Sequence, residues 1–324
     1  MSDRTSVTAL GALAILFWGS TIAFSRGLTE ELGTLTAAAS IYVLGGALAC
    51  ASTFSSRARR AGLAALPRAY WLACGSLFVI YTVCFYLAIG LARGRQQVVE
   101  VGLINYLWPT LTLALSVPIL GARARWTIVP GVAVACAGVV LATFATGPID
   151  LAALAANAAS NRLVYALAFV AAVAWGFYNN LARRLASDVP GNGVAAFILV
   201  SGLVLAGLRA LHPEPSRFGT GLALQLAYMA LFPTFLAYDL WDTAMRRGHI
   251  VLLASLSYLT PLLSTLISCG WLGLPFGPRL VAACALVIAG AWTCSRSVVM
   301  PETREPAAPR GSAGSGGEPG ASGR

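Results

Sequence analysis

The chain has 324 residues, of which 58% are hydrophobic and 10% charged, and its formal net charge is +10. Soluble domains carry about 25% charged residues, so this composition excludes an ordinary soluble domain and indicates an all-α integral membrane protein. Every basic residue is an arginine, and the arginines gather at the ends of apolar stretches. Such a distribution follows membrane topology and does not indicate nucleic-acid binding.

Ten apolar stretches are long enough to cross a bilayer, which takes roughly 17–25 helical residues. The first has no cleavage site followed by a soluble domain, so we expect it to be retained. The stretches lie near 7–25, 35–54, 70–91, 98–119, 127–145, 163–182, 193–211, 219–240, 250–271 and 279–297. They divide the chain into a first five-helix repeat (1–145), a connecting segment (146–162), a second five-helix repeat (163–299) and a disordered tail (300–324).

The arginines predict the orientation. If both termini are cytoplasmic, 15 of the 22 arginines lie on the inner side, and the densest loop, 57–68, holds four of them. Because cytoplasmic loops carry the excess of positive charge, we expect an N-in, C-in topology.

The first stretch matches the sixth. Residues 7–28 and 164–185 align with a shift of 157 and share a Trp-Gly pair that begins at Trp18 and Trp175. Trp18 lies about eleven residues into its span, too deep for the tryptophan belts that mark membrane interfaces. We therefore expect both tryptophans to line a cavity, together with Tyr42 and Tyr81 in the second and third stretches.

The fourth stretch matches the ninth. Residues 94–116 and 246–268 align with a shift of 152 and share the mid-span prolines Pro109 and Pro261. A proline has no N–H for the carbonyl four residues back, here those of Asn105 and Ser257. Interrupted helices at matched places in two halves indicate a transporter binding site. Since five helices per half is an odd number, the halves would form an inverted-topology repeat.

Polar groups within the fourth stretch are the main binding candidates. Asn105, Trp108 and Thr112 fall on one face at helical spacing. The Asn105 amide and its freed carbonyl suit the ammonium or carboxylate of a small zwitterion, with Trp108 as an apolar wall. Alternatively, the amide only satisfies the kinked backbone.

Glu100 lies nearer the outer end, about 140° around the helix from Asn105. It is interpreted either as a mouth residue paired with an outward arginine such as Arg93 or Arg95, or as a carboxylate that relays protons. Its counterpart in the second half is Leu252.

Small residues recur in the fifth and tenth stretches and allow close helix approach. We expect them to pack helices within each half; alternatively they form a dimer seam. They are Gly131, Ala135, Gly138, Ala282, Ala285 and Ala289.

The eighth stretch carries aromatic and acidic residues at spacings that predict one helical stripe. Its acids, Asp239 and Asp242, either attract the ammonium of a cytoplasmic substrate or, for Asp242, pair with Arg246 at i,i+4. The stripe comprises Tyr228, Phe232, Phe235, Asp239 and Asp242.

Enzyme, metal and cofactor motifs are lacking in the sequence. The seven cysteines fall in apolar stretches without metal-ligand spacing, and no nucleophile or phosphate-binding motif occurs. We therefore expect no catalysis, no cofactor and no metal.

Several motifs resemble the drug/metabolite transporter superfamily (EamA-like), and within it the YddG-type aromatic amino-acid exporters. The motifs are residues 100–109 (EVGLINYLWP), Ile41-Tyr42, residues 128–131 (IVPG) and Ala237-Tyr238 with Trp241. The resemblance implies an inner-membrane exporter whose central cavity is formed by helices 1, 3, 4, 6, 8 and 9. It implies that Trp18, Tyr81, Asn105, Trp108, Trp175, Tyr238 and Trp241 line that cavity. Asp239 and Asp242 stand outside the family pattern.

The sequence thus predicts a multi-pass exporter of aromatic amino acids (Phe, Trp, Tyr) in the bacterial inner membrane, working by alternating access. Asn105 and Ser257 would bind substrate near the breaks at Pro109 and Pro261. The alternatives are a multidrug or metabolite cation exporter coupled through a carboxylate such as Glu100 or Asp239, and a non-transporting scaffold that dimerises through the fifth and tenth stretches. A monomer contains both halves and suffices; a dimer stays open.

Overall fold

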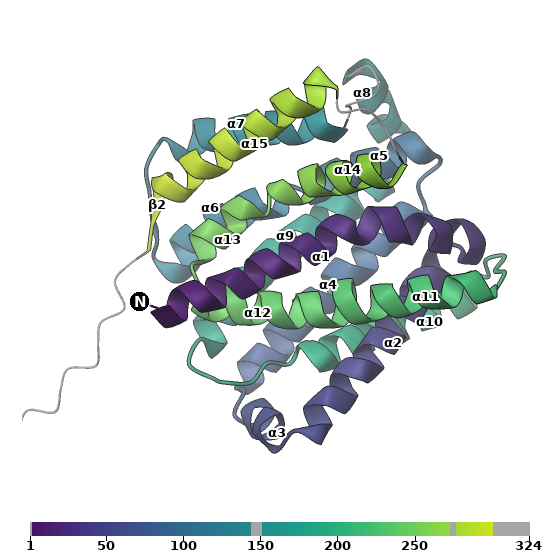
Figure 1. Cartoon of the computed structure of the whole chain (residues 1–324), viewed down its shortest axis with the longest axis horizontal. Helices are drawn as coiled ribbons and strands as arrows, with labels where there is room; N and C mark the ends of the chain where they lie inside the picture. The colour runs from purple at the N-terminus through teal and green to yellow at the C-terminus, as the bar shows by residue number, and fades with distance from the viewer. Residues whose placement is uncertain (1, 144–150, 273–276, 301–324) are drawn as a thin grey trace, which may run out of the picture.

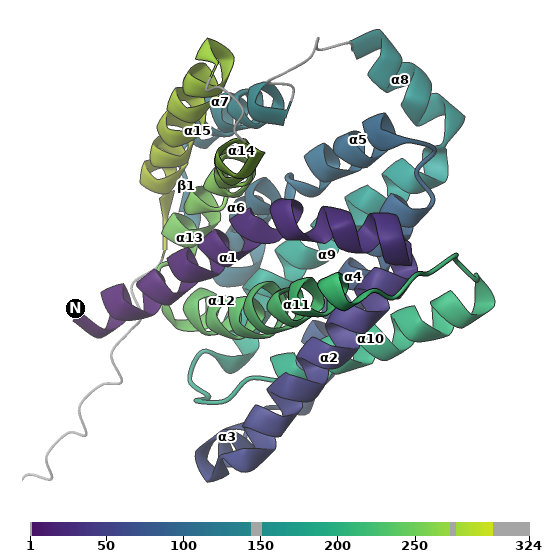
Figure 2. The ribbon, with the colours of Figure 1, turned by 45° about the vertical axis from the view of Figure 1, so that its right-hand side comes forward.

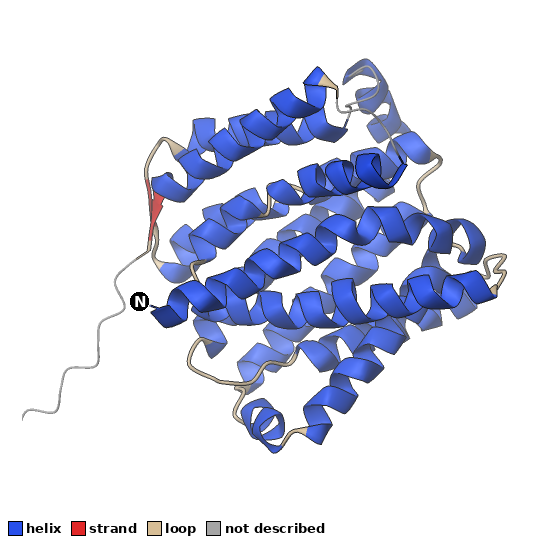
Figure 3. Cartoon of the chain, viewed as in Figure 1, coloured by secondary structure: helices blue, strands red, loops and turns tan. Residues whose placement is uncertain are grey.

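The computed structural model describes residues 2–143, 151–272 and 277–300, which are almost entirely helical (Figure 3). Residues 301–324 of the predicted tail (300–324) and residues 146–150 of the predicted connecting segment (146–162) lie outside the described residues. The first half contains α1 (Ser2–Leu32), α2 (Thr34–Ser55), α3 (Arg57–Ala64), α4 (Arg68–Gly90), α5 (Arg95–Asn105), α6 (Trp108–Leu120), β1 (Arg123–Ala124) and α7 (Ile128–Thr143).

The remaining elements begin with α8, a helix on the connecting segment. They are α8 (Leu151–Ser160), α9 (Arg162–Ala186), α10 (Val194–Leu211), α11 (Thr220–Met229), the π-helix η1 (Ala230–Leu236), α12 (Ala237–Arg247), α13 (Ile250–Leu256), α14 (Leu259–Leu272), α15 (Pro278–Ser297) and β2 (Val298–Val299). The chain N-terminus lies at the end of the molecule that carries α3, β1 and β2, and α8 lies at the opposite end (Figures 1 and 2).

Within the described ranges, seven helices are long and apolar enough to cross a membrane. Three shorter apolar helical segments, Thr5–Thr21, Ile128–Leu141 and Ile250–Ser264, fall in the first, fifth and ninth predicted stretches. The chain is therefore a mostly helical, multi-pass membrane protein.

Helices from the two halves of the chain pack on one another. The most extensive contacts join α2 to α10, α7 to α15, and α4 to α9. Helix α1 packs on α12 and α14, and α9 packs on α6. The short strands β1 and β2 pair antiparallel beside the α7–α15 contact, and Arg125 N donates to Ser297 O at 2.8 Å. These strands were not predicted from the sequence.

Both proline-bearing spans are interrupted. Helix α5 ends at Asn105 and α6 begins at Trp108, while α13 ends at Leu256 and α14 begins at Leu259. The hydroxyl of Tyr258, in the second interruption, lies 2.5 Å from Thr110 Oγ1 in the first turn of α6. A hydrogen bond across the halves thus joins the second interruption to the start of α6, just after the first interruption.

Two glycines let α1 and α9 approach the helices beyond the interruptions. A Cβ at Gly19 would lie 2.9 Å from Leu263 Cβ, and a Cβ at Gly176 would lie 3.0 Å from Leu111 Cβ. Leu111 and Leu263 are equivalent positions in the internal match, as are Gly19 and Gly176. The close approach after each Trp thus occurs twice, each time between halves.

The small residues of the fifth stretch pack against the other half, on α15. A Cβ at Gly138 would meet Val287 N at 2.7 Å, and one at Gly290 would clash with the backbone of Ala135. Our prediction of packing within each half was therefore wrong: Gly131, Ala135 and Gly138 bring α7 onto α15. The three predicted residues of the tenth stretch, Ala282, Ala285 and Ala289, are instead exposed. The same contacts occupy this face of α7 inside one chain.

The eighth stretch is not the regular helix that the predicted stripe requires. Pro233 interrupts it, and residues 230–236 form η1, whose wider turn shifts the register of the residues beyond it. Tyr228 and Phe232 therefore contact the α1 rings Phe24 and Phe17. Phe235 instead packs in a separate group with Ala49 and Ala195, so the prediction of a single stripe was wrong.

Candidate substrate site

A group of aromatic side chains, the central aromatic cluster, occupies the middle of the molecule. It comprises Trp18, Phe78, Tyr81, Trp108, Trp175, Tyr178, Tyr238 and Trp241. These rings come from α1, α4, α6, α9 and α12, so both halves contribute.

Trp175 is the hub of this cluster and is only 2% exposed. Its ring centroid lies 4.5 Å from Tyr81, 4.9 Å from Tyr178 in a stacked pair, and 5.6 Å from Tyr238. Trp18 and Trp108 contact it at 6.3 and 6.4 Å. Edge-to-face and offset contacts at these distances stabilise aromatic pairs beyond their burial. The rings that the sequence analysis proposed as cavity walls therefore pack against one another.

Hydrogen bonds fix the polar edges of the cluster. Trp241 Nε1 donates to Asn179 Oδ1 at 3.0 Å, and Asn179 Nδ2 donates to Thr112 Oγ1 at 3.1 Å. Trp18 Nε1 donates to Pro233 O at 3.0 Å, so the π-helical turn supplies an acceptor for α1. The Tyr42 hydroxyl lies 2.8 Å from that of Tyr238, which attaches Tyr42 to the rim of the cluster.

Asn105 lies at the edge of this cluster. Its side chain interacts with the hydroxyl of Tyr81 and is 8% exposed. Among the described residues, Asn105 Oδ1 has no hydrogen-bond partner although it is buried. A buried acceptor without a donor costs about 1–3 kcal/mol, and the ammonium group of a ligand is a suitable donor.

Ser257, the counterpart of Asn105 in the second half, is hydrogen-bonded within its own span. The residue is fully buried, and its Oγ donates to Leu253 O at 2.8 Å, one turn back in α13. The structure thus brings Trp18, Tyr42, Tyr81, Asn105, Trp108, Trp175, Tyr238 and Trp241 together, whereas the Ser257 hydroxyl is engaged by its own helix. Pro109 and Pro261 are both buried beside the interruptions.

Glu100 lies apart from the central aromatic cluster. Its carboxylate accepts from the Tyr165 hydroxyl and, at 3.1 Å, from Asn157 Nδ2. The neighbouring Val101 packs with Ala88 and Val164, so this part of α5 lies against α4 and α9. The residue is fully buried, unlike an open mouth residue. The proposed partner side chain of Arg95 lies outside the described side chains.

The two acids of the eighth stretch occupy different environments. Asp239 is partly exposed, accepts from Asn192 Nδ2 at 2.8 Å, and lies 3.7 Å from Arg59 Nη1. Asp242 is buried and forms the predicted i,i+4 ion pair with Arg246, at 2.7 Å from Arg246 Nε. This ion pair is hydrogen-bonded to the central aromatic cluster, because Tyr178 also donates to Asp242 Oδ1 at 2.7 Å.

Sequence reasoning missed the roles of Phe78 and Pro233. Phe78 is an apolar residue in an apolar span, so nothing in the pattern distinguishes it from a lipid-facing residue. Pro233 carried a usable signal, because a proline inside a span frees the carbonyl four residues back. Tyr178 and Asn179 follow Trp175 by three and four residues, and no local pattern indicates their partners in other helices.

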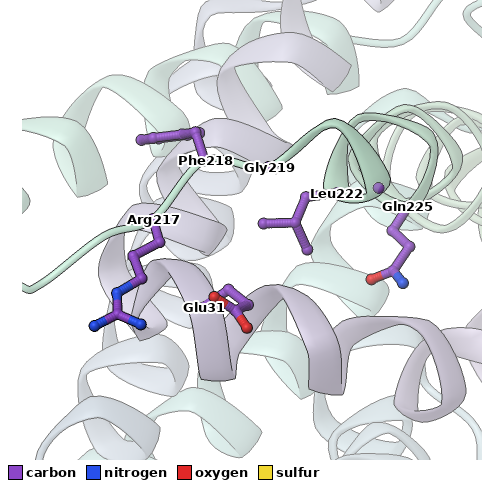
Figure 4. A pocket seen from close by; sticks show the side chains of 7 residues that line it. Glu31, Arg217, Phe218, Gly219, Leu222 and Gln225 are labelled. Atoms are coloured by element: carbon purple, nitrogen blue, oxygen red, sulfur yellow. The ribbon is translucent and has the colours of Figure 1, made fainter.

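The structure has a shallow pocket of about 430 Å³ at the end opposite the N-terminus, between α1 and the start of α11. Glu31, Arg217 and Gln225 contribute its polar side chains, and Phe218 and Leu222 its apolar ones (Figure 4). It lies away from the residues of the aromatic cluster. No group of His, Cys, Asp and Glu suited to hold a metal occurs in the part of the chain that the structure describes.

Comparisons with known proteins agree with this architecture. The EamA-like transporter family model matches twice, at residues 5–144 and 162–296. The "Aromatic amino acid exporter YddG" of Escherichia coli (strain K12) is 32% identical over 90% of this chain and 97% of its own length. A protein with the same name from Ancylobacter novellus is 34% identical over 89% of this chain and 96% of its own length.

A solved crystal structure matches 90% of this chain and 97% of its own chain with a TM-score of 0.74 and 27% identity. The likeness to these proteins therefore extends over nearly all of the described helices. Since the family model matches both halves, the chain belongs to the EamA-like transporter family.

Proposed function

We propose that the chain exports aromatic amino acids by alternating access. The observation that carries this proposal is the central aromatic cluster around Trp175, which joins helices of both halves beside the unpartnered Asn105 Oδ1. Aromatic rings offer stacking surfaces to an aromatic side chain, and the buried amide oxygen offers an acceptor to an ammonium. The names of the two exporter relatives support the same substrate class.

Because the rings are in contact, a substrate has to separate them. Trp18 and Tyr238 contact Trp175 from α1 and α12, and Trp108 contacts it from α6. Relative movement of these helices would open a space between the rings, and the interruptions at Pro109 and Pro261 are the places where α6 and α14 can reorient. In this proposal Asn105, not Ser257, orients the substrate.

The proposed frame is ten membrane-spanning helices, five in each of two inverted repeats at 1–145 and 163–299, with both termini inside. The two matches of one family model support the repeat. The packing also supports the repeat. If each span is replaced by its counterpart in the other half, the α4–α9 contact corresponds to the observed α12–α1 contact, and α6–α9 corresponds to α14–α1. The α2–α10 and α7–α15 contacts each join a span to its own counterpart, so this exchange leaves them unchanged. The proposed location is the bacterial inner membrane, and the proposed unit is a non-enzymatic monomer.

Transport in proteoliposomes tests the proposal. We expect wild type to carry labelled tryptophan and phenylalanine, and Trp108→Ala and Asn105→Ala to lower the rate at least tenfold, because each removes a group that contacts the substrate. Trp126→Ala is the matched control, since Trp126 is 79% exposed. No transport by wild type, or full transport by both variants, would contradict the proposal.

The cation-exporter alternative requires a carboxylate that faces the substrate. Glu100 is engaged by Tyr165 and Asn157 away from the central aromatic cluster. The other candidate, Asp239, is engaged by Asn192 and Arg59, which favours the amino-acid exporter. Unchanged tryptophan transport by both Glu100→Gln and Asp239→Asn, across a range of pH gradients, would exclude the cation exporter.

A further inference from the structure

The buried ion pair Asp242–Arg246 calls for a physical explanation. Both side chains are at most 1% exposed, whereas those of the Arg59–Asp239 pair are 46% and 24% exposed. Removing two charges from water costs several kcal/mol for each ion, and replacing such a pair with apolar residues is often neutral or stabilising. Stability alone therefore does not account for a buried pair at this place.

The pair is connected directly to the central aromatic cluster. Tyr178 donates to Asp242 Oδ1 at 2.7 Å, and the ring of Tyr178 stacks on Trp175 with an interplanar angle of 15°. Asp242 also directly follows Trp241, whose ring contacts Trp18 and Trp108. One hydrogen bond thus separates the charges from the rings proposed to hold the substrate's side chain.

The pair lies toward the end of the molecule that carries the N-terminus, and in this conformation it is enclosed. Tyr70 of α4 approaches Asp242 Oδ1 at 3.5 Å and accepts from Gly193 N at 3.3 Å. Arg246 Nη1 donates to Ala186 O at 2.7 Å and Val189 O at 3.1 Å, at the end of α9 and in the loop after it. Separation of α4 from α9 and α12 would expose both charges beside the rings.

Resting on the proposed export of aromatic amino acids, we propose that Asp242 and Arg246 recognise the zwitterionic head group as substrate enters from this end. On entry, before the ammonium reaches Asn105, the carboxylate of Asp242 receives the α-ammonium and the guanidinium of Arg246 receives the α-carboxylate. The indole or phenyl ring of the substrate then lies toward Trp175.

The opposite charges of Asp242 and Arg246 favour a zwitterionic ligand. A zwitterion brings one charge for each partner, so neither Asp242 nor Arg246 is left uncompensated when it binds between them. A cation would engage Asp242 and leave the Arg246 guanidinium unpaired in a buried place, which is strongly unfavourable. The site therefore discriminates against amines and acids that carry a single charge.

Analogues of tryptophan test this assignment. Tryptamine lacks the carboxylate, and indole-3-propionate lacks the ammonium; both are offered as competitors of labelled tryptophan in proteoliposomes. Wild type should prefer tryptophan over each by roughly tenfold or more, the range of one charge-assisted hydrogen bond. Asp242→Asn should abolish the preference over indole-3-propionate only, and Arg246→Gln the preference over tryptamine only.

A purely structural pair predicts a different result. It would lower folded yield in both variants while leaving the order of preference unchanged, and that result overturns the proposal. If a single variant fails to fold, the double variant Asp242→Asn/Arg246→Gln restores charge balance, and it must lose both preferences. Asp188→Asn and Arg184→Gln are the control variants, because they remove the same two kinds of charge from exposed residues at the same end of the molecule. Wild-type tryptophan transport is measured first, so failure of the exporter proposal is seen separately.

Discussion

At the scale of single residues, Asn179 decides how the aromatic cluster is held. Its amide accepts from Trp241 Nε1 and donates to Thr112 Oγ1, joining α9 to α12 and α6. The residue is fully buried, so each of these bonds replaces water that cannot enter. Asn180, the next residue, uses its amide nitrogen on the backbone oxygens of Thr112 and Gly176, at 2.9 Å each.

Replacing Asn179 should therefore cost more than one hydrogen bond. Asn179→Leu leaves Trp241 Nε1 unpaired in the core, and we expect a loss of about 1–3 kcal/mol in stability together with slower tryptophan transport. Thermal unfolding in detergent measures the first effect. Trp241→Phe removes the orphaned donor, so adding it to Asn179→Leu should restore part of the loss. Additive losses in the double variant would contradict the bridge.

At the scale of elements, the start of α2 depends on a residue far away in the chain. The Glu214 carboxylate accepts from Leu35 N at 2.9 Å and Thr36 N at 3.0 Å, and thereby caps a helix whose own N-cap residue, Gly33, has no side chain. A negative charge at a helix N-terminus is favourable. Gly33 has φ of 78°, and a Cβ there would lie 2.5 Å from Glu214 Oε2, so glycine is required.

We expect Glu214→Ala to destabilise the protein by about 1–2 kcal/mol, as the loss of an N-cap does. Glu214→Gln keeps an oxygen acceptor and should lose less. Glu31→Ala, which removes an exposed carboxylate from the neighbouring turn of α1, serves as control. Equal melting temperatures for Glu214→Ala and the control would exclude the capping role.

Local patterns predicted part of this element-scale picture. Proline chemistry located both interruptions, depth within its span identified Trp18, and the internal match identified Trp175. The partners of these residues depend on packing between segments about 150 positions apart, which no local pattern contains. The Tyr258–Thr110 bond and the direction of the α7–α15 packing were therefore not predicted. The π-helix at Pro233 was missed because a regular helical period was assumed.

At the scale of the whole molecule, near-equivalence of the halves coexists with unequal chemistry. Gly19 on Leu263 and Gly176 on Leu111 are matched contacts, so the framework repeats. The polar groups are not repeated in this way. Asn105 has an unpartnered side-chain oxygen, whereas the Ser257 hydroxyl is hydrogen-bonded within its own span. Asp242 and Glu100 lie near opposite ends of the molecule. A symmetric framework can open toward either side, while unequal groups give binding a direction.

The proposed orientation of this framework is open to a direct measurement. In a cysteine-free background, single cysteines replace Arg60 on α3, Arg125 beside β1, and Phe218 before α11, all exposed positions. A membrane-impermeant maleimide added to intact cells should label the cysteine at 218 alone, because the proposed topology places the other two, at the arginine-rich end, in the cytoplasm. In permeabilised cells, the cysteines at all three positions should be labelled. Labelling of 60 or 125 in intact cells would contradict the N-in topology, and opposite behaviour of 60 and 125 would contradict the placement of both loops on one side.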